Sequence, residues 1–101
     1  MTRLIPALLA ATLLASPVVA ADAKKKEFCQ INTDIIQRLV DMRLERVGKA
    51  KAVAELTKGE NAVPENYQVA VTQWSDWIYG QPRRDAKKFV ADEFYQACLT
   101  Q

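Results

Sequence analysis

Residues 28–47 read FCQINTDIIQRLVDMRLERV and decide the fold, because no other stretch combines this length with so broad an apolar face. At about 100° per residue, apolar side chains cover nearly half of the helical wheel and polar side chains fill the opposite side. A face of this width can pack against two neighbouring helices. Its apolar members are Phe28, Cys29, Ile31, Ile35, Ile36, Leu39, Val40, Met42 and Val47.

The N-terminal segment, residues 1–21, has the features of a secretory signal peptide. One basic residue precedes a charge-free run, and small residues occupy positions −3 and −1 for cleavage after Ala20 or Ala21. We therefore expect export to the periplasm through a cleaved signal peptide. An uncleaved membrane anchor is the alternative, because residues 4–21 reach the roughly 18 apolar residues that such an anchor requires.

Residues 22–27 include three successive lysines and have no apolar side to bury. They are expected to form a flexible, solvated lead-in, with weak contact to an anionic envelope surface as the alternative. The helical domain then covers residues 28–101. Lys and Arg total 14 against 12 Asp and Glu, and Arg3 lies in the N-terminal segment, so the mature chain that remains after cleavage is nearly neutral. No nucleic-acid partner is expected.

The two cysteines, Cys29 and Cys98, lie near opposite ends of the domain. In an oxidising compartment they are expected to pair, closing a loop of about 70 residues that stabilises the domain by roughly 4 kcal/mol. A bond between chains, or two free thiols, is the alternative. A domain of roughly 80 residues gains only a few kcal/mol from one hydrophobic core, which makes such a bond useful.

Three further helices are predicted after the first. A bend at Gly48 leads to a helix over residues 49–58, Pro64 begins a helix that Gly80 ends, and residues 82–99 form the last. No stretch alternates like a strand. The predicted fold is an all-α, compact four-helix bundle, with one disulfide joining the first and last helices. Its inward positions in the last helix are Ala86, Phe89, Val90, Phe94 and Ala97.

Several classes of chemistry are missing from the sequence. There is no histidine, Ser75 has no neighbouring elbow glycines, and the adjacent Asp92 and Glu93 point about 100° apart on a helix. The three glycines are scattered and form no phosphate-binding loop. We therefore expect no catalytic, cofactor or metal site, and no enzymatic activity.

Two surface stretches are candidates for binding a partner. Residues 83–88, RRDAKK, place four cations in the first turns of the last helix, where a solvated face is the simpler interpretation. Residues 74–80, WSDWIYG, place aromatic rings beside the inward stripe, where they can be the edge of the core or anchors of an interface. The candidate partner-binding residues are Trp77, Tyr79, Arg83, Arg84, Lys87 and Lys88.

Polar residues within the apolar arc of residues 28–47 need partners, because a buried amide or charge without one costs several kcal/mol. If the cysteines meet on antiparallel helices, Asn32 comes within about one turn of Glu93. Arg43 and Arg46 then lie near the level of Asp85. We predict two polar bridges, Asn32 to Glu93 and Arg43 or Arg46 to Asp85. The alternative is that these groups line a polar cleft for a ligand.

The chain contains the pattern Cys29, Arg43, Gly48, Ile78-Tyr79-x-x-Pro82 and Phe94-x-x-x-Cys98. In this pattern it resembles small exported helical proteins of proteobacteria, most of them uncharacterised. Its size and its run toward a terminal cysteine are similar to those of disulfide-stapled helical immunity proteins, which block secreted peptidoglycan hydrolases in the periplasm. In size and in having one disulfide it is also similar to the acid-stress periplasmic chaperones.

The expected function is that of an exported small helical protein that binds a protein partner in the cell envelope, as inhibitor, immunity factor or accessory subunit. An acid-stress periplasmic chaperone is the alternative. Acid separates the two, because neutralising 12 carboxylates leaves a strongly positive chain that can loosen the bundle.

Overall fold

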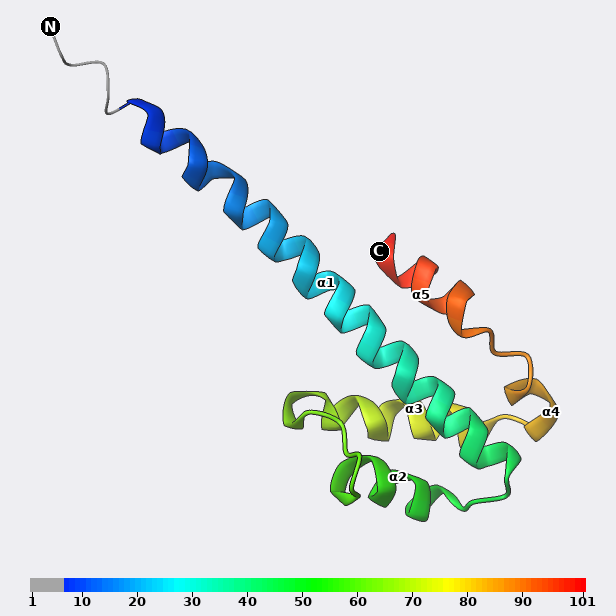
Figure 1. Cartoon of the computed structure of the whole chain (residues 1–101). Coiled ribbons are helices and arrows are strands. Elements are labelled where there is room, and N and C mark those ends of the chain that lie inside the picture. The colour runs from blue at the N-terminus through cyan, green and yellow to red at the C-terminus, as the bar shows by residue number, and fades with distance from the viewer. Residues whose placement is uncertain (1–6) are drawn as a thin grey trace, which may run out of the picture.

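A computed structural model describes the backbone of residues 7–101 and the side chains from Ala20 onward, and this part of the chain is helical without strands (Figure 1). The all-α prediction is confirmed, but residues 7–101 form five α-helices in place of the predicted four. The elements in chain order are α1 (Ala7–Leu44), α2 (Lys49–Lys58), the 3₁₀ turn η1 (Glu65–Tyr67), α3 (Gln68–Gly80), α4 (Arg83–Ala86) and α5 (Ala91–Leu99).

The long helix α1 is the axis of the fold, and α3 and α5 both pack against its C-terminal half (Figure 1). α5 runs back along α1, whereas α3 crosses it and also contacts α2. Ile35, Ile36 and Leu39 of α1 are completely buried at the centre. The other members of the buried core are Val40, Ala52, Leu56, Val63, Val71, Ile78 and Ala86.

Residues 22–27 are part of α1 rather than a flexible lead-in, although nearly all of their side chains are exposed as expected. An i,i+4 ion pair between Lys26 and Asp22 joins successive turns here. The predicted signal segment, residues 1–21, lies partly outside the described residues, and so does the alternative anchor. Within the described part of the chain, no helix combines the length and the apolar character needed to cross a membrane.

α1 ends at Leu44, earlier than the predicted bend at Gly48, because a Schellman motif closes it. The Val47 amide donates to the Met42 carbonyl at 2.9 Å, and the Arg46 amide donates to the Arg43 carbonyl at 3.1 Å. Arg46 has the left-handed conformation that this motif requires, with φ at 66°. The exposed Arg46 side chain therefore belongs to a turn and not to the apolar face of α1.

The predicted last helix is broken into α4 and α5. Val90, a β-branched residue, has extended angles of φ −119° and ψ 111° and is the N-cap of α5. The break changes the helical phase, so that Val90 and Ala97 are exposed rather than inward. Ala86 is buried as predicted, and Phe89 and Phe94 pack partly buried against the core.

The disulfide between Cys29 and Cys98 is present, with 5.7 Å between the two Cα atoms, and it joins the first and last helices as predicted. It matters because α5 has no residue that is fully buried. The Lys25 ammonium also donates to the Gln101 carbonyl, a second contact between these two chain segments. The attachment of α5 to α1 therefore depends on the covalent bond and on the partial burial of Phe94.

The predicted bridge between Asn32 and Glu93 is wrong, because the break before α5 turns Glu93 to solvent. Asn32 is only 5% exposed, and its side chain makes hydrogen bonds to other partners. Its Nδ2 donates to the Phe28 carbonyl at 2.9 Å, and its Oδ1 accepts the indole N–H of Trp74 at 2.9 Å. The polar contact at this level thus joins α1 to α3 instead of α5.

The second predicted bridge is also wrong. The Arg43 guanidinium donates to the Gln81 carbonyl at 3.1 Å and lies 5.1 Å from the centre of the Tyr79 ring. Asp85 pairs with Lys88 at 3.6 Å within its own turn. Arg43 therefore reaches α3 and the link that follows it, by a backbone acceptor and an aromatic face rather than by a carboxylate.

Loss of the disulfide should unfold the domain. Replacing Cys98 by Ser removes a constraint on about 70 residues and lowers the free energy of unfolding by roughly 4 kcal/mol. A domain of this size has a total stability of only a few kcal/mol. We expect Cys98→Ser to be largely unfolded or protease-sensitive, by circular dichroism and limited proteolysis. Treating the wild type with reductant should have the same effect, and a melting temperature unchanged by reduction would contradict the prediction.

The Asn32 side chain should contribute to stability through its two hydrogen bonds. Asn32→Ala leaves the Trp74 indole N–H without its acceptor, and an unpaired buried donor costs about 1–3 kcal/mol. Urea unfolding should show a loss of this size. Asn66→Ala is the control, because Asn66 is exposed and its replacement should change stability by less than about 0.5 kcal/mol. Equal losses in the two variants would mean that the buried hydrogen bond adds nothing.

Candidate functional site

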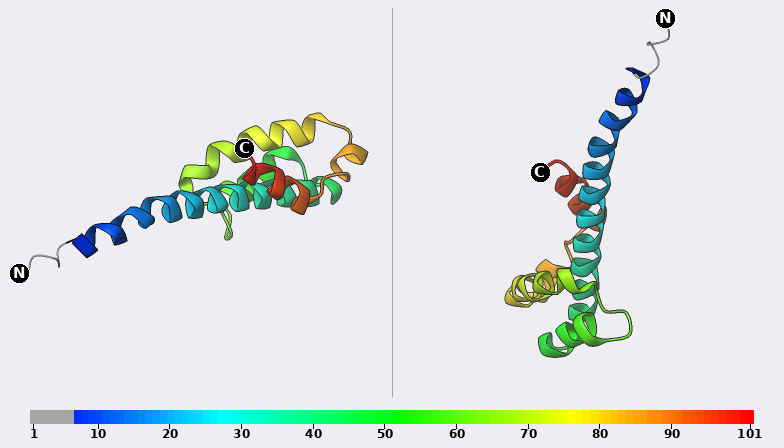
Figure 2. Two further views of the ribbon diagram at one scale, coloured as in Figure 1. Left: turned by 90° about the horizontal axis from the view of Figure 1, so that it is seen from above. Right: turned by 90° about the vertical axis from the view of Figure 1, so that its left-hand side faces the viewer.

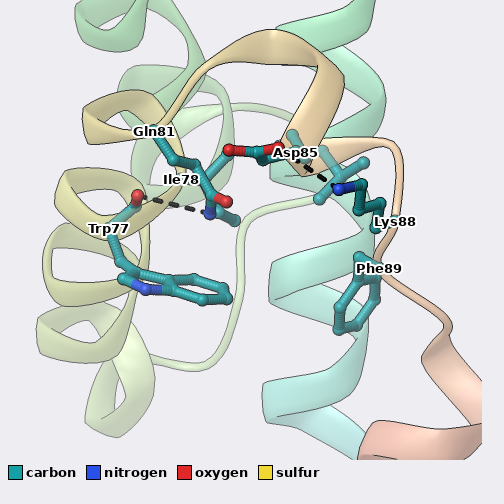
Figure 3. Close-up of a pocket in the computed structure, with 8 residues that line it drawn as sticks. Trp77, Ile78, Gln81, Asp85, Lys88 and Phe89 are labelled. Carbon is teal, nitrogen blue, oxygen red and sulfur yellow. Dashed lines mark hydrogen bonds and ion pairs between the residues drawn. The ribbon is translucent and has the colours of Figure 1, made fainter.

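A cleft of about 450 Å³ opens between the C-terminal end of α3 and the segment formed by α4 and residues 87–90 (Figure 3). α1 supplies one residue at its base. The lining residues are Val40, Trp77, Ile78, Gln81, Asp85, Ala86, Lys88 and Phe89.

The floor of the cleft is apolar and belongs to the core. Val40, Ile78 and Ala86 are at most 4% exposed, so the base is fixed by the packing of α1, α3 and α4. Trp77 and Phe89 lie on opposite sides of the cleft, as Figure 3 shows. Trp77 is 55% exposed, which is unusual for so large an apolar side chain. The site therefore has a rigid apolar base and aromatic walls open to solvent.

Four aromatic rings in edge or tilted contact connect the two walls of the cleft. The Trp77 ring lies 5.8 Å from that of Trp74, and Trp74 lies 5.6 Å from Phe94 at an interplanar angle of 86°. Phe94 in turn lies 5.9 Å from Phe89. Such pairs contribute about 0.5–1.5 kcal/mol beyond their buried area. Because Asn32 also holds Trp74 by a hydrogen bond, the row is positioned from α1.

Polar and charged groups occupy the rim. Gln81 Nε2 donates to the Trp77 carbonyl at 3.5 Å, and Lys88 pairs with Asp85 at 3.6 Å, both drawn in Figure 3. The Lys88 side chain is 80% exposed, so this ion pair adds little stability. Arg84 and Lys87 are exposed beside the cleft without lining it. The rim on the α4 side is therefore mainly cationic.

Two of the predicted partner-binding residues, Tyr79 and Arg83, make hydrogen bonds within the fold. The Tyr79 hydroxyl donates to the Val47 carbonyl at 2.8 Å, and Arg83 Nε donates to the Arg43 carbonyl at 3.3 Å. These bonds attach the end of α3 and the start of α4 to the end of α1. Partial burial raises the pKa of Tyr79 above its ordinary value of 10.0, and the nearby Arg43 charge opposes this change.

Of the predicted residues, Trp77 and Lys88 line the cleft together with Asp85, which was predicted as a bridge. The sequence gives no indication that Gln81 and Ile78 line a cleft, and its periodicity places Phe89 in the core stripe. Phe89 gave no signal of its position in the cleft, because the helical periodicity continues through the break at Val90 that leaves Phe89 in the link between α4 and α5. Gln81 gave no signal, because its position depends on the turn between Gly80 and Pro82.

The arrangement can hold an apolar side chain, because its base is apolar and its walls are aromatic. Among the described residues, no group of three or more Cys, Asp or Glu side chains is placed to bind a metal ion. Comparisons with protein-family models, with curated proteins and with solved structures found no match to this chain.

The raised pKa of Tyr79 predicts a loss of stability in alkali. The unfolded chain loses the phenolic proton near pH 10 and the folded chain only above it, so the contribution is complete below pH 10 and disappears as pH rises through the folded pKa. Tyr79→Phe cannot ionise. The free energy of unfolding, measured in urea from about pH 8 to 11, should fall more steeply for the wild type than for Tyr79→Phe. Parallel curves would contradict the prediction.

Proposed function

We propose that the protein is exported and acts in the cell envelope by binding a protein partner through the cleft between α3 and α4. The single observation on which this depends is the exposure of Trp77, 55%, beside a buried apolar floor. Aromatic residues beside such pockets are the usual anchors of protein interfaces. An apolar side chain of the partner would sit between Trp77 and Phe89.

Export is supported by the disulfide, since such bonds persist in oxidising compartments. The N-terminal segment, residues 1–21, is the proposed signal peptide, with the composition described above. Periplasmic localisation is therefore part of the proposal. A helical domain whose first and last helices are joined by a disulfide is suited to a compartment outside the cytoplasm.

The charge of the rim indicates the chemistry of the partner. Arg84, Lys87 and Lys88 are exposed on the α4 side of the cleft, and Asp85 balances one of these charges. An acidic segment with one central apolar residue complements this surface. The protein would then act as inhibitor, immunity factor or accessory subunit, by covering a surface of its partner rather than by chemistry of its own.

Truncating Trp77 tests the proposal. Trp77→Ala should weaken association with the partner by about 2 kcal/mol, close to thirty-fold in Kd, while stability changes little. The partner is first captured from periplasmic extract with the tagged mature protein and a cross-linker, then purified for calorimetry. Val69→Ala is the matched control, because Val69 is an apolar residue of α3 that is 70% exposed and does not line the cleft.

The control variant should bind like the wild type. If Trp77→Ala retains full affinity, or if Val69→Ala loses as much, the cleft is not the interface. A large loss of stability in Trp77→Ala without a specific loss of binding would return Trp77 to a structural role. Binding of many unfolded proteins in acid alone would instead indicate the chaperone.

A further inference from the structure

A second cleft lies where α1, η1 and α3 meet, at the other end of α3 from the first. Its volume is about 390 Å³, within the range of about 300–1,000 Å³ found for small-molecule sites. None of its lining residues is charged, although 26% of the chain is. The lining residues are Phe28, Asn32, Asn66, Tyr67, Ala70, Gln73 and Trp74.

Each of the three elements supplies one aromatic ring and one carboxamide to this cleft. α1 contributes Phe28 and Asn32 one turn apart, and α3 contributes the adjacent Gln73 and Trp74. η1 contributes the adjacent Asn66 and Tyr67. The amides therefore approach from three directions instead of forming a line along one edge.

The rings provide an accessible apolar surface. Phe28 is 53% exposed, and its ring lies 6.2 Å from that of Tyr67 at an interplanar angle of 44°. Trp74 is fixed by its indole hydrogen bond to Asn32. Tyr67 and Trp74 pack partly buried against the core, whereas Phe28 does not, so the Phe28 ring is the most freely accessible of the three.

The three carboxamides of the cleft differ in how many of their hydrogen-bonding groups remain available to a ligand. Asn32 uses its carbonyl and one N–H within the fold. Asn66 and Gln73 are exposed, and among the described residues their side chains make no hydrogen bond. Each free carboxamide offers two donors and one acceptor oxygen to a ligand.

We propose that this second cleft binds a neutral saccharide. Sugar rings combine an apolar C–H face, which packs against aromatic rings, with hydroxyl groups around the edge that both donate and accept hydrogen bonds. Carboxamides arriving from three elements match hydroxyls spread around a ring. An extended peptide fits less well, because its donors and acceptors form a line, and a charged ligand finds no counter-charge in the lining. An acetamido sugar adds an amide that the carboxamides can pair with.

The first experiment measures binding of a chitotetraose probe, the tetramer of N-acetylglucosamine, to the folded mature protein. The chain has two tryptophans, so Trp77→Phe makes Trp74 the only indole reporter. Its fluorescence should change on titration, with a Kd in the millimolar range or below. In the same background, the double variant Asn66→Ala/Gln73→Ala should bind at least tenfold more weakly, with an unchanged circular dichroism spectrum, because both side chains are exposed.

Gln30→Ala is the control, because Gln30 is an exposed amide on α1 that lies outside this cleft. It should bind chitotetraose like the unmodified background. A second arm replaces the soluble tetramer by insoluble peptidoglycan sacculi in a sedimentation assay. Binding to both probes identifies the glycan strand of the cell wall as a source, and binding to chitotetraose alone identifies a free oligosaccharide.

Three results would overturn the proposal. The first is the absence of any fluorescence or calorimetric response to chitotetraose and sacculi. The second is equal affinity in the double variant and in Gln30→Ala, which would place the sugar elsewhere. The third is saturable binding of tetra-alanine in preference to chitotetraose, which would identify the cleft as a peptide site. These results do not depend on Trp77, so failure of the saccharide proposal can be distinguished from failure of the proposed protein-binding cleft.

Discussion

The disulfide between Cys29 and Cys98 is the constraint on which the rest of the domain depends. α5 buries no residue completely, so apolar packing alone holds it weakly against α1. Yet α5 supplies Phe94, which contacts Trp74 on one side and Phe89 on the other. The covalent bond thus fixes the aromatic row, and through it the wall of the first cleft.

Trp74 has a comparable role among the noncovalent contacts. Its indole N–H is held by Asn32, and its ring contacts both Trp77 and Phe94. It also lines the second cleft. Trp74 therefore connects the two clefts, because it lines the second and contacts Trp77 in the wall of the first. It is positioned by Asn32, a polar residue of α1 that sequence periodicity places inside an apolar face. A buried polar residue of this kind specifies which helix packs where, because only one neighbour satisfies it.

The sequence allowed the helical class, the bounds of α2 and the disulfide to be predicted, because these depend on local pattern and on cysteine number. It did not reveal the break at Val90, since the periodicity continues through it. The break turns Glu93 to solvent, so the predicted register that placed Glu93 near Asn32 was wrong. Trp77 could be identified as an edge residue, but the cleft beside it required the positions of Gln81 and Phe89, which turns and tertiary packing determine.

α1 runs without interruption from Ala7 to Leu44, through the proposed cleavage point. Removal of residues 1–21 would accordingly shorten a helix rather than cut a connecting loop, and the new end would lie about two turns before Cys29. A fresh α-ammonium and the positive end of the helix macrodipole would then sit beside Asp22, which favours them, and three lysines, which do not. Maturation would in this way change the electrostatics at one tip of the molecule, within one turn of the Lys25 ammonium that donates to the Gln101 carbonyl.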